Sequence, residues 1–397
     1  MRHSDFPIFT THPNLAYLDT AATAQVPYVV LDAVMQFETT MRANVHRSVY
    51  LLADAATEAY ESARREIAVF IGAAEHEVSF VPSVTYGMHM VAEMIGERLQ
   101  SGDSVLVTAM EHHSVLLPWR HVVGKRGAMV STIPMHDDYR LDMDALAIML
   151  RQNVKVVVVT AASNVLGTVN PIADIVRLAH KAGALVVVDA AQYVPHLPLN
   201  IPVWGADVVV FSGHKLYGPM GIGVMYIAEH LGRTFTPSVQ GGGMVVDVRR
   251  GQSVWEDAPW KFEAGTPNVS GVVGLSAAMR YVKNVGYAAI TEHEENLTRE
   301  LIVGLLSLRG IRIIGPDNIN ERIGVVSFTV PNVHPHDIAT LMGSDGVAIR
   351  AGHHCVQPLV EEIDRRGVCR ASLGGYSTTE DVARCIESLD RARKTLL

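Results

Sequence analysis

Two apolar runs of the chain stop abruptly at polar side chains, and this feature constrains the fold most. Val186–Val188 runs into Asp189, and Val208–Phe211 runs into Ser212. Continuous apolar runs of this kind are typical of parallel strands that helices cover on both faces. Ligands bind outside the carboxyl ends of such strands. We therefore expect one crevice lined by the polar residues that follow the two runs: Asp189, Gln192, Ser212, His214 and Lys215.

Asp189 and Lys215 suit the chemistry of pyridoxal phosphate. A lysine forms the Schiff base with the aldehyde of that cofactor, and a carboxylate keeps its pyridine nitrogen protonated. The glycines of segment 213–223 let the backbone pass close to a flat ligand, and their spacing differs from the dinucleotide fingerprint. A single strand that ends in Asp or Lys is common in proteins of any function. Two such strands in succession favour a binding site.

Strand-like and helix-like segments alternate over residues 15–226. Helical patterns such as Ile172–Ala182 lie between the strand candidates. The clearest strand candidates are short and rich in β-branched residues: Ser104–Thr108, Val154–Thr160, Leu185–Asp189 and Val208–Phe211. This alternation predicts an α/β fold with a doubly wound, mostly parallel sheet flanked by helices.

The pattern changes after about residue 270, where a long helical stretch begins. Three further strand candidates follow it: Ile311–Ile314, Gly324–Val330 and Val347–Arg350. The last helix opens with a capping box that we assign to Ser377 and Glu380. This second part of the chain predicts a smaller α+β domain.

A chain of 397 residues is long enough for two domains. We expect a large cofactor-binding domain over residues 19–282 and a small domain built from residues 1–18 and 283–397. The net charge of -8 and the absence of Lys and Arg blocks argue against a nucleic-acid partner. The first residues lack the apolar stretch of a signal peptide, and no apolar run approaches a membrane span. A cytoplasmic protein with no membrane partner is the expectation.

The three cysteines have different surroundings in the sequence. Their odd number and wide spacing argue against a disulfide framework and suit a reducing compartment. Cys385 lies on the apolar face of the last helix, and Cys369 alternates with Arg370 in a strand, so we expect both thiols in the core. Cys355 lies in a loop bracketed by glycine and proline, with imidazoles beside the thiol. It is therefore the candidate nucleophile.

Two other interpretations of Cys355 compete at this point. One is a buried loop cysteine, and the other is a metal ligand together with His353 and His354. Adjacent side chains rarely converge on one ion, and the chain has no Cys-x-x-Cys pair, so we expect no metal. Reactivity of the thiol depends on its exposure and its pKa, which are properties of the folded chain.

Five motifs spread over the chain belong together. They are Met-Glu-His-His at 110–113, Ser-Asn-Val-Leu-Gly-Thr at 163–168, Ser-Gly-His-Lys-Leu-Tyr-Gly-Pro at 212–219, Phe-Glu-Ala-Gly-Thr-Pro-Asn at 262–268 and Arg-Ala-Gly-His-His-Cys at 350–355. With these motifs the chain resembles, over nearly its whole length, the group II cysteine desulfurases of the SUF sulfur-mobilisation system.

The resemblance implies a fold-type I pyridoxal phosphate-dependent transferase of the class V aminotransferases, working as a homodimer. It implies that L-cysteine becomes L-alanine while the sulfur forms a persulfide on Cys355. An acceptor protein (SufE-like or SufU-like) or a small thiol would then take this sulfur for iron-sulfur cluster assembly. A selenocysteine lyase or a cysteine sulfinate desulfinase would use the same site. An aminotransferase of this fold would have no use for Cys355. A non-catalytic assembly scaffold would have no need for all four of Asp189, Lys215, Cys355 and Arg370.

The resemblance also assigns roles around the cofactor ring. Lys215 would be the Schiff-base lysine, and Asp189 the partner of the pyridine nitrogen. Gln192 would hydrogen-bond the phenolic oxygen of the cofactor, with Asn164 beside it. His112 would stack on the ring and take part in catalysis, and a satisfied loop histidine is the alternative interpretation. His112 follows the strand candidate that ends at residue 108, which places it at the same sheet edge as Asp189.

The cofactor phosphate would be held by hydroxyl and imidazole groups. The resemblance assigns it to Thr85, Ser212, His214 and, from the other subunit, Thr266. Thr85 precedes the predicted helix Met88–Leu99, and a helix N-terminus offers free amides and a positive dipole end to an anion. A plain helix cap is the alternative for Thr85. The neighbouring residue 84 is valine where a second threonine is usual in the family.

The substrate would meet a further group of side chains. Arg370 would bind the substrate carboxylate, which the planar guanidinium suits, with Asn164 nearby. Arg350 would shape the cysteine loop, and a surface arginine that caps a strand is the alternative. His46 and Arg47 match a family segment near the active site, and a solvated pair at a helix end is the alternative for these two residues.

Overall fold

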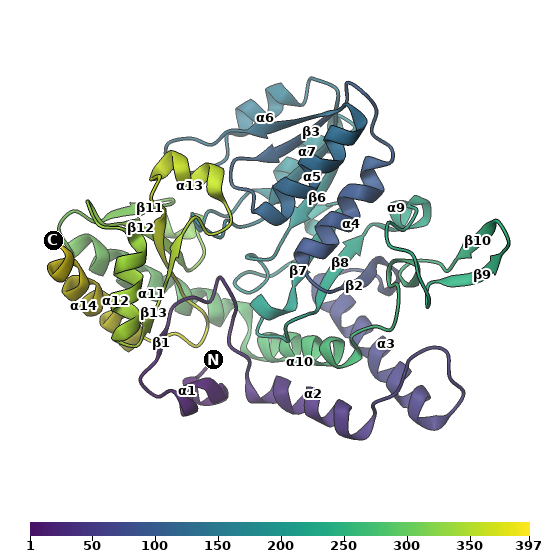
Figure 1. Ribbon diagram of the computed structural model, residues 1–397, viewed down its shortest axis with the longest axis horizontal. Helices are drawn as coiled ribbons and strands as arrows, with labels where there is room; N and C mark the ends of the chain where they lie inside the picture. Colours follow the sequence, from purple (N-terminus) through teal and green to yellow (C-terminus); the bar gives the residue numbers. More distant parts are fainter.

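The computed structural model describes all 397 residues. Figure 1 shows a large body around a central sheet and, beside it, a smaller body that carries the C-terminal helix. None of the helices combines the length and the apolar character that a membrane span requires.

The central sheet has seven strands in the order β2-β8-β7-β6-β5-β3-β4. Their bounds are β2 Val78–Val81, β3 Ser104–Thr108, β4 Met129–Ile133, β5 Val154–Thr160, β6 Leu185–Asp189, β7 Val208–Ser212 and β8 Gly223–Ile227. The five strands from β4 to β7 run parallel, whereas β8 is antiparallel to both of its neighbours. The predicted mostly parallel sheet is confirmed.

Helices cover both faces of this sheet (Figure 1). The helices of the large body are α2 Tyr28–Thr40, α3 Leu51–Ile71, α4 Val84–Gly96, α5 His113–Arg126, α6 Met143–Met149, α7 Ile172–Lys181, α8 Ile201–Trp204, α9 Glu229–Thr234 and α10 Val269–Val285. Successive residues of a strand point to opposite faces. In β5, Val156 and Val158 join the core under α4 and α5, while Val157 and Val159 join the core that includes α7 and α10. The apolar runs without alternation arise because both faces are buried.

The smaller body is built on an antiparallel sheet in the order β11-β12-β15-β14. Its elements are α11 Tyr287–Ser307, β11 Arg312–Ile314, β12 Val325–Thr329, α12 Pro335–Ser344, β13 Val347–Ala348, β14 Arg350–Gly352, α13 Gln357–Ile363, β15 Val368–Ser372 and α14 Thr379–Leu396. The start of the chain contributes α1 Pro7–Thr11 and β1 Ala16–Tyr17, and β1 pairs in parallel with β13. Cys369 and Cys385 are buried in its core, as predicted.

A two-stranded hairpin extends away from the large body at the right of Figure 1. It consists of β9 Val245–Arg249 and β10 Gln252–Trp255. Val246, Val248 and Val254 are all more than half exposed in the single chain. The hairpin therefore presents apolar side chains that the chain itself does not cover.

Three predicted details of the secondary structure are wrong: the start of one helix, the continuity of one strand and the residues of one capping box. The helix expected at Met88 begins at Val84, because the Ser83 hydroxyl caps it by accepting from the Tyr86 amide. The strand expected over 347–350 is divided between β13 and β14, which lie in different sheets. The capping box of the last helix uses Thr378 and Asp381, since the Ser377 hydroxyl is occupied by the Gly374 amide instead.

Candidate active site

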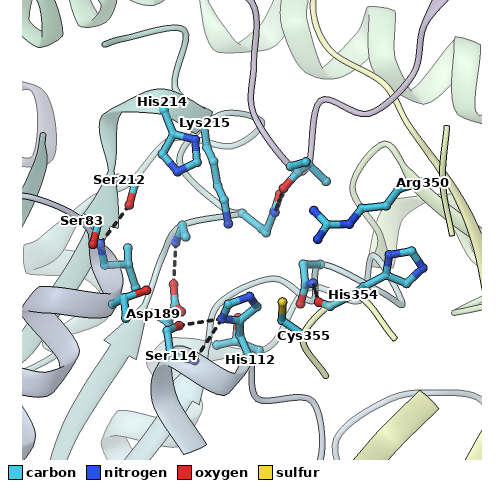
Figure 2. Close-up of a pocket in the computed structure, with 18 of the residues that line it drawn as sticks. Ser83, His112, Ser114, Asp189, Ser212, His214, Lys215, Arg350, His354 and Cys355 are labelled. Atoms are coloured by element: carbon cyan, nitrogen blue, oxygen red, sulfur yellow. Dashed lines mark hydrogen bonds between the residues drawn. The ribbon is translucent and has the colours of Figure 1, made fainter. Parts of the chain in front are cut away.

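A cavity of about 190 Å³ lies where the carboxyl edge of the central sheet meets the smaller body. Eleven of the fourteen residues singled out from the sequence line it: Thr85, His112, Asn164, Asp189, Gln192, Ser212, His214, Lys215, Arg350, Cys355 and Arg370. Figure 2 shows Lys215 reaching toward the middle of this cavity, with Asp189 below it and Arg350 and Cys355 on the opposite side. The cavity thus brings together side chains at the ends of β6 and β7 with side chains from the antiparallel sheet of the smaller body.

Asp189 and Lys215 form the buried polar pair at the sheet edge. Asp189 ends β6, is 4% exposed, and accepts a hydrogen bond at Oδ1 from the Ala191 amide at 2.9 Å. Burial raises the pKa of Asp189, and the charge of Lys215 opposes this rise. Burial lowers the pKa of Lys215, and Asp189 opposes that change. The lowered pKa favours the neutral amine, the nucleophilic form that reacts with an aldehyde.

The N-terminus of α4 faces the same cavity. The Val84 amide donates to the Ser212 hydroxyl at 2.9 Å, while Thr85 lies in the first helical turn and lines the cavity. Burial and the neighbouring Lys215 lower the pKa of His214 to about 4, so this ring is neutral near pH 7. A helix N-terminus with two hydroxyls and a neutral imidazole is a suitable site for a phosphate group. The side chain of Val84 packs in the core, and its amide remains on the cavity side.

His112 caps α5 and faces the cavity as a neutral ring. Its Nδ1 accepts from the Ser114 amide at 3.1 Å and lies 2.8 Å from the Ser114 hydroxyl. Nδ1 therefore carries no proton, and the ring proton is on Nε2. Burial, and then the charge of Lys215, lower the pKa of His112 to about 3. A neutral imidazole can lie against an aromatic cofactor ring without repelling its protonated nitrogen.

Glu111 is a buried acid at this edge that the sequence analysis did not single out. Its Oε1 accepts from the Thr108 hydroxyl at 2.7 Å and from the Thr160 amide at 2.8 Å. Burial raises the pKa of Glu111 to about 8, and the charge of Asp189 adds to the effect. Glu111 is therefore protonated near pH 7. Its Oε1 accepts the hydrogen bond of the Thr160 amide, which lies on β5 beyond the end of the neighbouring strand β3.

Arg370 is 1% exposed and anchored on both sides. Its Nη2 donates to Asp19 Oδ1 at 2.9 Å, and its Nη1 donates to the Asn164 carbonyl at 2.9 Å. Its Nε is buried and has no partner in the chain. A guanidinium that lines the cavity and keeps unpaired N–H donors suits a carboxylate ligand. Asp19 was not foreseen as a site residue.

The N-terminal segment supplies another contact that the sequence did not reveal. Gln192, which follows β6, donates through Nε2 to the Ala21 carbonyl at 2.7 Å. Ala21 and Ala22 line the cavity beside it. Residues near the start of the chain therefore close one wall of the site, although nothing in their side chains indicates chemistry.

Cys355 lies in a strained loop between β14 and α13. His354 and Cys355 both have left-handed backbone angles, with φ of 50° and 59°. This conformation costs a non-glycine residue about 1–2 kcal/mol. The Asn164 side chain donates to the His354 carbonyl at 2.9 Å, and the His354 ring bonds through Nε2 to the Val368 carbonyl at 3.0 Å. The Cys355 sulfur thus shares the cavity with Lys215 and two arginines.

Three residues singled out from the sequence lie outside this cavity. His46, Arg47 and Thr266 line a separate cavity of about 220 Å³ together with residues 242–243 and 260. His46 pairs through Nε2 with Glu61 at 2.8 Å. In the single chain His46 and Arg47 lie apart from Lys215 and Cys355, so their place near an active site stays a prediction. Thr266 was expected to serve the other subunit.

The side chains around the cavity fit pyridoxal phosphate. A buried lysine with a lowered pKa suits its aldehyde, a buried carboxylate suits its pyridine nitrogen, and the α4 terminus suits its phosphate. The neutral His112 and the amide of Gln192 remain for the ring and its phenolic oxygen.

Comparisons with known proteins agree with this geometry. The profile of the family described as aminotransferase class-V matches residues 16–385. A cysteine desulfurase of Enterobacter sp. (strain 638) is 41% identical over 399 residues, which cover 99% of this chain and 98% of the relative. The apo structure of a cysteine desulfurase from Thermococcus onnurineus NA1 matches with a TM-score of 0.95 at 36% identity, covering 99% of this chain and 98% of that one. The Escherichia coli cysteine desulfurase CsdA, as its S-sulfonic acid form, matches with a TM-score of 0.92 at 35% identity, covering 100% and 98%.

Proposed function

This chain belongs to the class-V aminotransferase family, and from that premise we propose that it is a pyridoxal phosphate-dependent cysteine desulfurase. One observation carries the proposal: the thiol of Cys355 shares a cavity with the buried Lys215 and Asp189. Lysine and aspartate are enough for an aminotransferase. A cysteine held beside them by a loop of the smaller body is what sulfur transfer requires.

The residues of the cavity divide the work of holding the cofactor. Lys215 would hold its aldehyde carbon, Asp189 its pyridine nitrogen, and Gln192 its phenolic oxygen. The cofactor, when bound, supplies an electron sink that stabilises negative charge on the substrate carbon. His112 would cover one face of the ring as a neutral imidazole, since its pKa of about 3 keeps it uncharged.

The substrate groups have matching partners. Arg370 would bind the carboxylate of L-cysteine through its unused Nε donor. Lys215, once its amine is free, would remove the Cα proton and later return a proton, and burial favours this role because it lowers the pKa of the amine. A substrate held between Lys215 and Arg370 would share the cavity with the Cys355 thiol.

Sulfur transfer then takes place at the Cys355 thiolate. Its sulfur attacks the substrate sulfur, and the bond between the substrate sulfur and Cβ breaks with its electron pair left on the carbon. That carbon takes up a proton, so L-alanine leaves and a persulfide remains on Cys355. The reaction needs no outside oxidant or reductant.

The phosphate site supports a homodimer. Thr85, Ser212 and His214 line the cavity within one chain, whereas Thr266 lies in a second cavity with Arg47. A twofold partner would bring Thr266 and its neighbours to the phosphate end of the other subunit, and the apolar residues of the β9–β10 hairpin would be covered in the same contact.

The proposed product serves iron-sulfur cluster assembly in the cytoplasm. The persulfide would pass to an acceptor protein of the SufE-like or SufU-like kind, or to a small thiol. Cys355 is partly exposed in the single chain, which supports access by such an acceptor. Selenocysteine lyase and cysteine sulfinate desulfinase activities would use the same cavity, and the test below separates them.

The proposal is tested by alanine formation with the cofactor-loaded protein under anaerobic conditions with a reductant. L-cysteine, L-selenocysteine and L-cysteine sulfinate are compared at equal concentrations. We expect alanine and sulfide from L-cysteine in equal amounts over many turnovers. Alanine from selenocysteine or sulfinate alone, or pyruvate in place of alanine, would overturn the assignment.

A further inference from the structure

His113 connects the large body to the loop that carries Cys355. Its backbone amide donates to the Cys355 carbonyl at 2.8 Å, and its ring Nε2 accepts from the Gln357 amide at 3.2 Å. Asn164 of the large body makes one hydrogen bond to this loop, at the His354 carbonyl, whereas His113 makes two, at Cys355 and at Gln357. We propose that His113 is a positioning residue that clamps the Cys355 loop for sulfur transfer, an inference that rests on the proposed function.

The loop needs such a clamp because its own backbone conformation is unfavourable. His354 and Cys355 occupy the left-handed region in succession, and non-glycine residues keep it only where their surroundings impose it. One hydrogen bond within the loop, from the Val356 amide to the His353 carbonyl, is too little to impose it alone. Asn164 holds the His354 carbonyl from one side, and His113 holds Cys355 and Gln357 from the other.

The two bonds of His113 have separate chemical requirements. The amide bond needs only a backbone N–H at this position, which is the first residue of α5. The ring bond needs an acceptor at Nε2, and so a neutral imidazole with its proton on Nδ1. These requirements allow one substitution to remove the ring bond alone and another to remove both bonds.

The surroundings of His113 keep its ring neutral. Burial lowers its pKa, and the charges of Arg120 on the same helix and of His353 in the cysteine loop lower it further. The adjacent ring of His112 is itself neutral. In a protonated His113, Nε2 carries a proton and can no longer accept from the Gln357 amide. Protonation at low pH would therefore break the hydrogen bond at the Gln357 end of the loop.

Three substitutions dissect the clamp. His113→Gln keeps the amide and places a carbonyl oxygen about where Nε2 lies, so both bonds persist at all pH values. His113→Leu keeps only the amide bond. His113→Pro removes both bonds. Proline suits this position because it is the first helical residue, and because the preceding His112 has an extended backbone with ψ of 152°. His121→Leu, an exposed histidine of α5, is the matched control.

Two measurements follow the series. Amide hydrogen exchange of the peptide around residues 353–360 reports the Gln357 bond without any turnover. Alanine formation from L-cysteine, with kcat and KM separated, reports the consequence for sulfur transfer. We expect faster exchange and about tenfold lower kcat with little change in KM for His113→Leu, a larger loss for His113→Pro, and recovery in His113→Gln.

The pH profile adds a readout that a merely structural histidine would not change. On acidification the wild type should lose kcat as His113 takes up a proton, whereas His113→Gln should lack that part of the loss. Equal exchange and equal kcat in wild type and His113→Leu, or a Gln variant as impaired as the Leu variant, would overturn the clamp. If the wild type makes no alanine the proposed function fails instead. If His113→Pro does not fold, the Leu and Gln pair still decides.

Discussion

The two halves of the active site are built in different ways. The cofactor half belongs to the regular sheet, since Asp189 ends β6 and Lys215 follows β7 within three residues. The sulfur half is a short loop with two left-handed residues, held by hydrogen bonds that reach across from the other body. Rigid strands fix the groups that must hold a cofactor. The sulfur carrier depends on contacts between the two bodies, which hold its unfavourable left-handed backbone in place.

The largest expected effect comes from the cofactor half. Lys215→Ala removes the amine that holds the cofactor aldehyde, and no other lysine lines the cavity. We expect no measurable alanine formation from L-cysteine and loss of the cofactor on gel filtration. A spectrum that still shows the lysine-bound cofactor after reconstitution would mean that another lysine does this work.

The second largest effect isolates the sulfur half. Cys355→Ala should retain the cofactor and its spectrum, because the cofactor contacts come from the sheet edge. We expect alanine formation from L-cysteine to fall by about a thousandfold. Cys385→Ala, at a buried cysteine distant from the cavity, serves as the control for loss of a thiol. Turnover of the Cys355 variant at the parent rate would contradict the division into two halves.

The two halves also differ in how far their residues could be predicted from the sequence. Asp189, Lys215 and Ser212 were found because each follows an apolar run, and the carboxyl ends of parallel strands meet at one edge. Cys355 was found from its glycine and proline brackets and its imidazole neighbours. The resemblance to a family supplied the roles, and the fold class was predicted correctly.

Asp19, Glu111 and His113 were not foreseen as parts of the site. Each acts through partners that are distant in sequence: Arg370, Thr160 and Cys355. No local pattern marks a residue whose importance arises from a contact with a segment far away in the sequence. Glu111 and His113 stand in the Met-Glu-His-His motif, which is the one signal that could have drawn attention to them. The resemblance alone assigned His46 and Arg47 to the active site, and in the single chain they line a separate cavity with Thr266, so that assignment stays a prediction.

A third prediction concerns the hydrogen bond between Asp19 and Arg370, which joins the two bodies beside the cavity. Its carboxylate fixes one arm of Arg370, so Asp19→Ala should leave that guanidinium free to turn away from the substrate carboxylate. We expect about a tenfold rise in KM for L-cysteine with a smaller change in kcat, because one charge-assisted hydrogen bond is lost. Asp19→Asn keeps an acceptor oxygen and should be less impaired. An unchanged KM in Asp19→Ala would show that Arg370 needs no such support.

The smallest effect on turnover is expected at Glu111, where stability is the more informative quantity. Its pKa is about 8 in the fold, above the value of 4.5 for an unburied carboxyl. A raised pKa contributes stability that is complete at low pH and is lost as pH rises from the unfolded value to the folded one. Glu111→Gln lacks this titration, so the Gln variant should gain stability relative to wild type between pH 4.5 and about 8.

Denaturant unfolding of wild type and Glu111→Gln at several pH values across that window measures the difference. Both proteins contain Asp189, so its own titration largely cancels in the comparison. A difference in the free energy of unfolding that stays constant with pH would contradict a protonated Glu111 in the folded chain.

The most direct test of the account is the mass of the peptide that contains Cys355 after a single turnover. The cofactor-loaded protein is mixed anaerobically with one equivalent of L-cysteine, without reductant, then alkylated, digested and analysed by mass spectrometry. We predict the mass of one added sulfur atom on Cys355, in an amount equal to the alanine formed, and none on Cys369 or Cys385. Alanine formed without added sulfur on Cys355 would contradict the assignment of this thiol as the sulfur carrier.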